Sequence, residues 1–106
     1  MKIVNITRGF VEFDNGKYIK YYHEQDCCEC NYADFEQIDD IAMEQEFSEE
    51  LKFEKLGHGF RFGDERYMVY VPCYSIQNGF YSSCVDIYFD DKEIFSVSGE
   101  IYDWFF

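Results

Sequence analysis

The sequence predicts an α+β domain, an antiparallel β-sheet of about six or seven strands with one short helix inserted after the N-terminal hairpin. Two observations predict the sheet: short runs in which apolar and polar residues alternate, and Asn-Gly pairs between such runs. A third, apolar residues at helical spacing after residue 34, predicts the helix. The length of 106 residues suits a single domain, 1–106, and an aromatic content of 22% is sufficient to build its core.

A β-hairpin is the first predicted element. Apolar residues alternate with polar ones from Val4 to Phe13, as in a strand with one buried face. The Asn-Gly pair at residues 15–16 then marks a tight turn, because both residue types tolerate positive φ angles. Residues 18–23 form the predicted return strand, and Gly9 is expected to bend or bulge the first strand.

A loop and then the helix are expected next. Residues 24–30 are polar and rich in cysteine, which is typical of a loop. Asp34 has the properties of an N-cap, and Gln37 three residues later completes a capping box. Between residues 31 and 50 there are eight acids and no Lys or Arg, so repulsion is expected to keep the helix short or break it near residues 43–48. The expected buried helix positions are Phe35, Ile38, Ile41 and Ala42.

Strands are predicted again from residue 51 to residue 101, joined by short turns that imply antiparallel neighbours. Val85, Ile87 and Phe89 should share one buried face, because they alternate with polar residues. Pro72 lacks an N–H group and is expected to end its strand or to lie at a sheet edge. The aromatic tail at residues 104–106 is expected to dock on the core or on a partner.

The charge of the chain narrows the classes of partner. There are 22 acids and 9 bases, which gives a net charge of −13. Such a field repels nucleic acids and anionic membranes, whose binding depends on Lys and Arg. Two interpretations remain open: the charge confers solubility, or an acidic face meets a basic partner protein or mimics nucleic acid toward it.

Apolar runs and cysteine usage predict the compartment. No apolar run approaches the roughly 20 residues that span a bilayer, and the first residues do not have the pattern of a signal peptide. Five cysteines, two of them adjacent, are more simply explained as reduced thiols than as a disulfide framework. A cytoplasmic location is therefore expected.

Two segments resemble a known family. Residues 22–29 read YHEQDCCE directly after a predicted strand, and residues 78–86 read NGFYSSCVD. Together, in this order and with an acidic stretch between them, they resemble a family of small uncharacterised phage and prophage proteins. The resemblance implies a setting, the cytoplasm of a bacterial host cell, and it implies no particular activity.

The cysteine-rich loop offers a candidate metal site. Thiolates and imidazole suit zinc, which takes four ligands in a tetrahedron. Adjacent cysteines in a regular strand point to opposite sides, however, and no CxxC pair is present. The alternative is that these thiols pack as small apolar groups. The candidate ligands are His23, Cys27, Cys28 and Cys30.

The same loop permits a catalytic alternative, in which one of the adjacent cysteines is a nucleophile and His23 its base. Asp26 or Glu24 would then orient the imidazole. Such partners usually converge from distant parts of a chain, and the acidic surroundings disfavour a thiolate. A catalytic role is therefore not expected.

The preferred hypothesis is a non-enzymatic binding protein of a phage or mobile element, possessing no cofactor. Its tyrosines exceed what one sheet face can bury, so some of them are expected on a protein-binding surface. The partner would be a basic host or phage protein, and a zinc-binding structural module and a homodimer remain open alternatives. The acids expected to contact the partner are Asp34, Glu36, Asp39, Asp40, Glu44 and Glu46.

Overall fold

A computed structural model describes residues 1–23, 30–77 and 82–102, and within these ranges the chain forms ten β-strands. The strands are β1 (Ile3–Ile6), β2 (Phe10–Phe13), β3 (Tyr18–Tyr22), β4 (Cys30–Ala33), β5 (Lys52–Leu56), β6 (Gly59–Gly63), β7 (Met68–Ile76), β8 (Cys84–Phe89), β9 (Lys92–Ser98) and β10 (Glu100–Tyr102).

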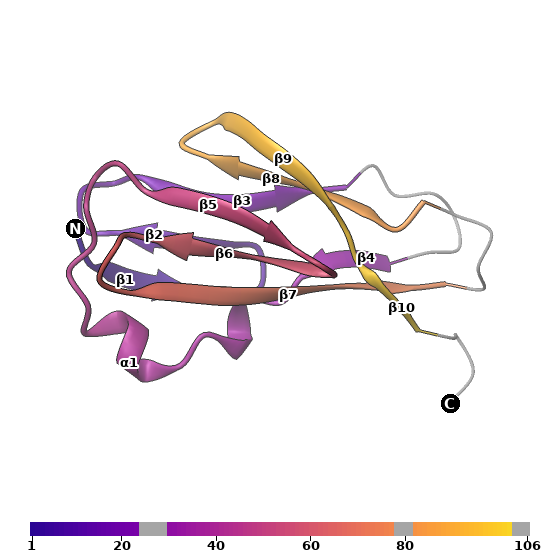
Figure 1. The fold of residues 1–106 in the computed structure, drawn as a ribbon, viewed down its shortest axis with the longest axis horizontal. Coiled ribbons are helices and arrows are strands. Elements are labelled where there is room, and N and C mark those ends of the chain that lie inside the picture. Colours follow the sequence, from indigo (N-terminus) through magenta and orange to yellow (C-terminus); the bar gives the residue numbers. More distant parts are fainter. Residues whose placement is uncertain (24–29, 78–81, 103–106) are drawn as a thin grey trace.

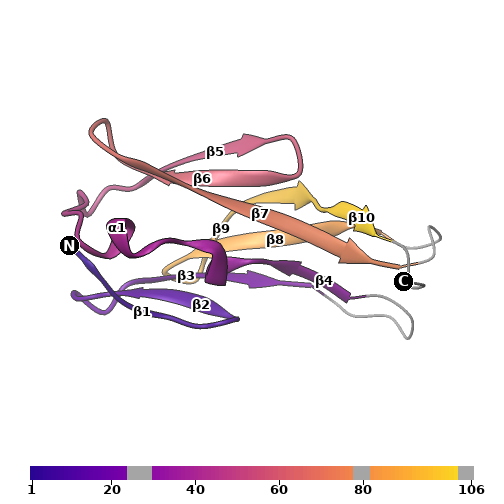
Figure 2. The same ribbon diagram turned by 90° about the horizontal axis from the view of Figure 1, so that it is seen from below.

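The strands form two sheets that face each other (Figures 1 and 2). The first sheet has the order β1-β2-β3-β8-β9, and the second has the order β10-β7-β6-β5 with β4 paired to β7. The chain passes from β9 in the first sheet to β10 in the second at Gly99. A Cβ atom at Gly99 would lie 2.9 Å from the backbone carbonyl carbon of Tyr74, so only glycine allows this close crossing.

The predicted sheet is confirmed, whereas the predicted helix and strand number are wrong in detail. Helical structure in the described ranges is confined to two single turns, the 3-10 turn η1 (Phe35–Gln37) and α1 (Asp40–Met43). Gly9 lies in the turn that separates β1 from β2, so the single strand expected before the Asn-Gly turn is two strands. Gly99 likewise divides the expected last strand into β9 and β10. β10 also pairs with β7 in parallel, although antiparallel neighbours were expected. A hairpin would reverse the chain after β9, whereas at Gly99 the chain crosses into the second sheet instead.

Asp34 occupies the N-cap position of η1, as predicted, but its side chain makes no cap bond, and the α-helical turn starts only at Asp40. Asp39 is the residue that caps α1, since its carboxylate accepts from the amide of Ala42 at 3.2 Å. Asp34 instead follows β4, and its carboxylate accepts from the Gln37 side chain at 2.8 Å. Extended backbone at Ile38 separates the two turns, and α1 ends at Met43, where a break was predicted.

Two hairpin turns use positive φ angles in different ways. The Asn-Gly turn is confirmed, but only Gly16 adopts a positive φ, 87°, and its amide donates to the Phe13 carbonyl at 3.0 Å. Between β8 and β9 both Asp90 and Asp91 have positive φ, 50° and 68°, as a type I′ turn requires. Aspartate tolerates this region because its short side chain bonds locally.

Pro72 lies inside β7, contrary to expectation. β7 runs through it, and Pro72 pairs with Gly59 of β6. On its other edge, β7 pairs with β4 only as far as Ala33 and Cys73. The ring nitrogen of Pro72, which carries no hydrogen, therefore faces the position just past the end of that ladder. The Pro72 carbonyl is satisfied there, because it accepts from the Asp34 amide at 2.9 Å. The strand loses no ladder bond and tolerates the proline.

Aromatic rings fill the space between the sheets at one end. The Phe13 ring meets the rings of Phe47, Phe62 and Phe89 edge-on, with centroids 6.0, 6.3 and 6.4 Å away. Edge-to-face pairs of this kind are favourable beyond the area that they bury. The predicted inward face of β8 is confirmed for Val85 and Ile87, which are fully buried, whereas Phe89 is half-buried.

Candidate functional site

Residues 34–46, here called the acidic segment, lie in the connection from β4 to β5 and carry all six acids predicted to contact a partner. In Figure 2 this segment runs between the β5–β6 hairpin and the β1–β2 hairpin, so it covers one open side of the two-sheet stack. Five of the six acidic side chains are exposed, and Asp34 is half-buried. The segment that carries the six carboxylates therefore lies along one side of the molecule.

Several of these carboxylates also have local partners. Glu36 pairs with Arg8 at 3.3 Å, and Glu46 pairs with the Met1 amine at 3.3 Å. Asp39 serves as the helix cap. Asp40 and Glu44 are exposed on α1 and its end. Positive groups thus border the acidic segment at two points, and its role in binding stays a prediction.

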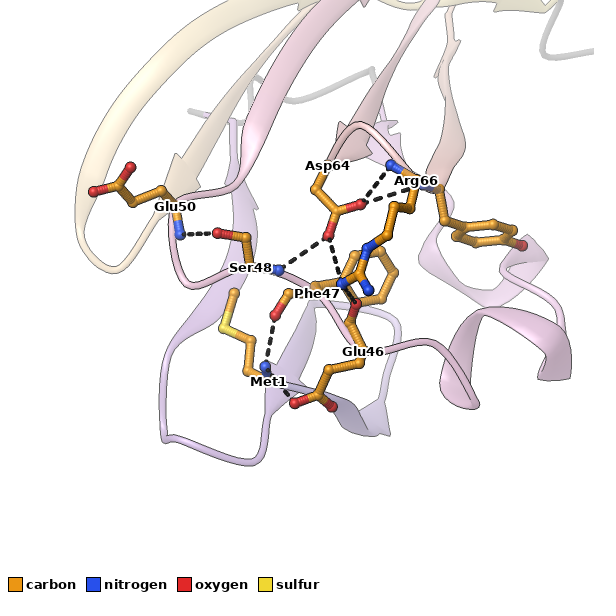
Figure 3. Close-up of polar contacts among 8 residues, drawn as sticks. Met1, Glu46, Phe47, Ser48, Glu50, Asp64 and Arg66 are labelled. Carbon is orange, nitrogen blue, oxygen red and sulfur yellow. Dashed lines mark hydrogen bonds and ion pairs between the residues drawn. The ribbon is translucent and has the colours of Figure 1, made fainter.

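The chain just after the acidic segment is fixed by a carboxylate in the β6–β7 turn (Figure 3). Asp64 accepts from the backbone amides of Ser48 at 3.1 Å, Arg66 at 2.9 Å and Tyr67 at 3.2 Å. The amides of Arg66 and Ser48 lower the pKa of the Asp64 carboxyl, because they favour its ionised form. Asp64 thus joins two segments that are distant in sequence.

Further bonds hold the same junction together (Figure 3). The Arg66 guanidinium donates to the Glu46 carbonyl at 3.1 Å. The Met1 amine donates to the Phe47 carbonyl at 2.6 Å, and the Phe47 amide donates to the Met1 carbonyl at 2.7 Å. Phe47 itself is buried in the aromatic core. The acidic segment is therefore anchored by core packing as well as by polar bonds.

A row of tyrosines lies beside the start of the acidic segment. Tyr32 of β4, Tyr74 of β7 and Tyr102 of β10 form this tyrosine row, with successive ring centroids 5.6 Å apart. The Gln37 side chain donates both to Asp34 and, at 3.1 Å, to the Tyr74 hydroxyl. The start of the acidic segment therefore adjoins the tyrosine row. The expectation that some tyrosines are exposed is confirmed for Tyr102, which is 42% exposed.

A cleft of about 440 Å³ opens where β4 faces the β1–β2 turn. We call it the β4 cleft. Tyr21 lies within it and packs against the buried Phe35, with ring centroids 6.0 Å apart. Burial and the nearby Cys30 raise the pKa of Tyr21. The lining residues are Arg8, Tyr21, Cys30, Tyr32, Ala33, Asp34 and Glu36.

The predicted metal site is described only at its ends. Cys27 and Cys28 lie outside the described residues, as do Asp26 and Glu24 of the catalytic alternative. His23 lies beside Asn31, with its Nδ1 atom 3.5 Å from the amide nitrogen, and Cys30 is exposed on β4. Among residues 1–23, 30–77 and 82–102, no three His, Cys, Asp or Glu side chains gather as metal ligands would. The zinc site stays a prediction, which metal analysis of protein purified without chelator can test.

The remaining buried thiol has no nucleophilic character. Cys73 is fully buried, and burial raises its pKa to about 12. A thiol with this pKa is protonated at neutral pH, whereas attack on a substrate needs the thiolate. Cys73 therefore has a packing role.

Sequence reasoning did not predict a buried polar cluster at the end of β7. The Ser75 hydroxyl donates to the Asn31 side chain at 2.5 Å, and the Gln77 side chain donates to Ser75 at 2.6 Å. Asn31 also donates to the Ser82 carbonyl at 2.7 Å. The alternation that identifies apolar faces cannot detect this cluster, because polar residues occupy inward positions.

No helix in the described part of the chain is long and apolar enough to cross a bilayer. Comparison with known proteins gives no matching family, no similar curated protein and no similar solved structure, so the likeness to phage proteins stays a prediction.

Proposed function

We propose that this protein is a non-enzymatic binding module that uses the acidic segment and the adjoining tyrosine row to engage a basic protein. The observation that supports this most directly is the continuity of the two features through Gln37, which contacts both Asp34 and Tyr74. Carboxylates steer a basic partner to the surface, and tyrosines then supply contact area at low entropic cost.

The overall charge favours the same function. With 22 acids and 9 bases, the chain attracts cationic surfaces and repels nucleic acid and anionic lipid. By analogy with the phage proteins that it resembles, the partner is a host or phage protein in a bacterial cytoplasm. A protein that normally binds nucleic acid is the obvious candidate, and occupation of its basic surface by this chain would inhibit it.

Capture of basic proteins from bacterial lysate at low salt tests the proposal. We expect capture to weaken as salt rises, because the Debye length falls to about 10 Å at 0.1 M. A variant carrying Glu36→Gln, Asp40→Asn and Glu44→Gln should lose the captured proteins.

A matched variant provides the control for net charge. Asp14→Asn, Asp90→Asn and Glu93→Gln remove the same charge from exposed positions outside the acidic segment. This variant should retain capture. Equal loss in both variants, or capture that is insensitive to salt, would contradict the proposal.

A further inference from the structure

The β4 cleft combines two kinds of group that recognise a guanidinium. Asp34 and Glu36 contribute carboxylates, and Tyr21 and Tyr32 contribute aromatic rings. A guanidinium is planar, donates to carboxylates through paired N–H groups, and stacks on aromatic faces. A lysine ammonium is a compact and strongly hydrated charge, so it gains less from the same surroundings. The lining of the cleft therefore favours arginine over lysine.

Arg8 of the chain itself shows that a guanidinium fits at the rim. Its Nε atom lies 3.3 Å from the Glu36 carboxylate, while its side chain is 92% exposed. Exposed ion pairs of this kind contribute little free energy, so this contact is easily exchanged. Arg8 therefore covers one carboxylate of the cleft without filling the cleft.

Tyr32 connects the cleft to the tyrosine row. It lines the cleft, and its ring lies 5.6 Å from that of Tyr74. Burial, and after it the charge of Asp34, raise the pKa of Tyr32, as expected for a ring beside negative potential. A segment that crosses the tyrosine row thus passes the mouth of the cleft.

We infer that the β4 cleft receives an arginine side chain from the partner, which displaces Arg8 from Glu36 while the rest of the partner segment lies along the tyrosine row. The inference rests on the proposed function, and it narrows the partner to a protein with an arginine on an exposed segment. Arg8 acts as an internal competitor for the incoming guanidinium.

Labelled oligo-arginine and oligo-lysine peptides of equal length and charge test the inference by fluorescence anisotropy. We expect the arginine peptide to bind about two- to fivefold more tightly, the ratio that an exposed cation–π contact provides. Tyr32→Leu should abolish this preference and Tyr32→Phe, which retains the ring, should keep it. Tyr70→Leu is the matched control, because Tyr70 is 49% exposed on β7 and does not line the cleft.

The competitor role of Arg8 has its own control. Arg8→Ala should tighten binding of the arginine peptide more than Lys92→Ala, which removes the same charge from the exposed start of β9. Equal affinity for the two peptides, with no effect of Tyr32→Leu, would overturn the inference and leave the proposed function standing. Failure of both peptides to bind would overturn both.

Discussion

The two halves of β7 face the same interior with opposite chemistry. Val69 and Val71 in the first half point into an apolar core, beside strand β6. In the second half the inward residue beyond Cys73 is the polar Ser75, and Gln77, directly after the strand, is polar as well; both are fully or almost fully buried. The partners of this half are β4 and β10. One strand therefore passes from an apolar end of the molecule to a polar one.

The difference between the apolar and polar ends of the interior suggests that the first mainly stabilises the fold and the second mainly positions the candidate binding surface. Apolar burial is non-directional and stabilises the fold wherever volume is filled. Buried hydrogen bonds add little net stability, but they specify one arrangement, because any other leaves polar groups unpaired. The polar end carries β4 and β10, and hence both the β4 cleft and the tyrosine row. We expect large stability effects at the apolar end and smaller, more specific effects at the polar end.

Truncation of Phe13 gives the largest expected effect. Phe13 is 1% exposed and meets three other phenylalanine rings. Phe13→Ala should lower the free energy of unfolding by about 3–5 kcal/mol, because it removes apolar contact and leaves a cavity. Urea titration followed by circular dichroism measures this change. Val4→Ala, at a 53% exposed position, is the control, and an equal loss there would contradict a concentrated core at this end.

The matching change at the polar end is Asn31→Ala. It removes the acceptor of the Ser75 hydroxyl and the donor to the Ser82 carbonyl. We expect a loss of about 1–3 kcal/mol, because buried groups are left without these bonds. A double-mutant cycle with Ser75→Ala separates their coupling from simple packing. Strictly additive losses would show that the two side chains do not act as a unit.

The same contrast explains what the sequence could predict. Where the interior is apolar, alternation identifies the buried face, and the inward positions of Val85 and Ile87 are confirmed. At the polar end the signal was absent. Strand β4 was assigned partly to a loop and partly to a helix, because Asn31 carries a polar side chain into the interior.

Pairing between distant segments was also beyond local patterns. After Asp34 only the single turn η1 forms, since β4 pairs with β7 up to Ala33 and the Asp34 amide donates to the Pro72 carbonyl. Of the candidate surface, the acids were predicted as a group, since charge is visible in composition. The neighbouring tyrosine row and the β4 cleft depend on the pairing of β4, β7 and β10, which sequence periodicity does not show.

The free energy of unfolding, measured as pH is lowered, tests the role of Asp64 as an anchor at the apolar end. The pKa of Asp64 lies below its usual value of 3.8, so ionised Asp64 stabilises the fold above that pH. This contribution should disappear as pH falls through the lower pKa of the folded state. The stability gap between wild type and Asp64→Asn should therefore be constant near neutral pH and close in acid. Urea midpoints over a pH series measure it, and a gap that persists unchanged in acid would show that the charge is unimportant.

Cys73 marks the boundary between the apolar and the polar half of β7. Alkylation of its thiol can be followed in the wild-type protein. Its burial and its pKa of about 12 leave on the order of one thiol in ten thousand ionised at pH 8. Cys30 and Cys84 are exposed and serve as internal controls when labelling by iodoacetamide is read by peptide mass spectrometry. We expect these two to react readily and Cys73 to react only through global unfolding, because it packs in the same buried cluster as Val71 and Phe60.

The dependence of Cys73 labelling on urea decides how cooperative the two halves are. If the polar end unfolds together with the apolar core, the labelling rate should rise with urea as steeply as global unfolding does. A rate with little urea dependence would show that the polar end opens alone, with the boundary before Cys73. The β4 cleft and the tyrosine row would then belong to a segment that can separate from the core, and partner binding would have to supply the free energy that orders it.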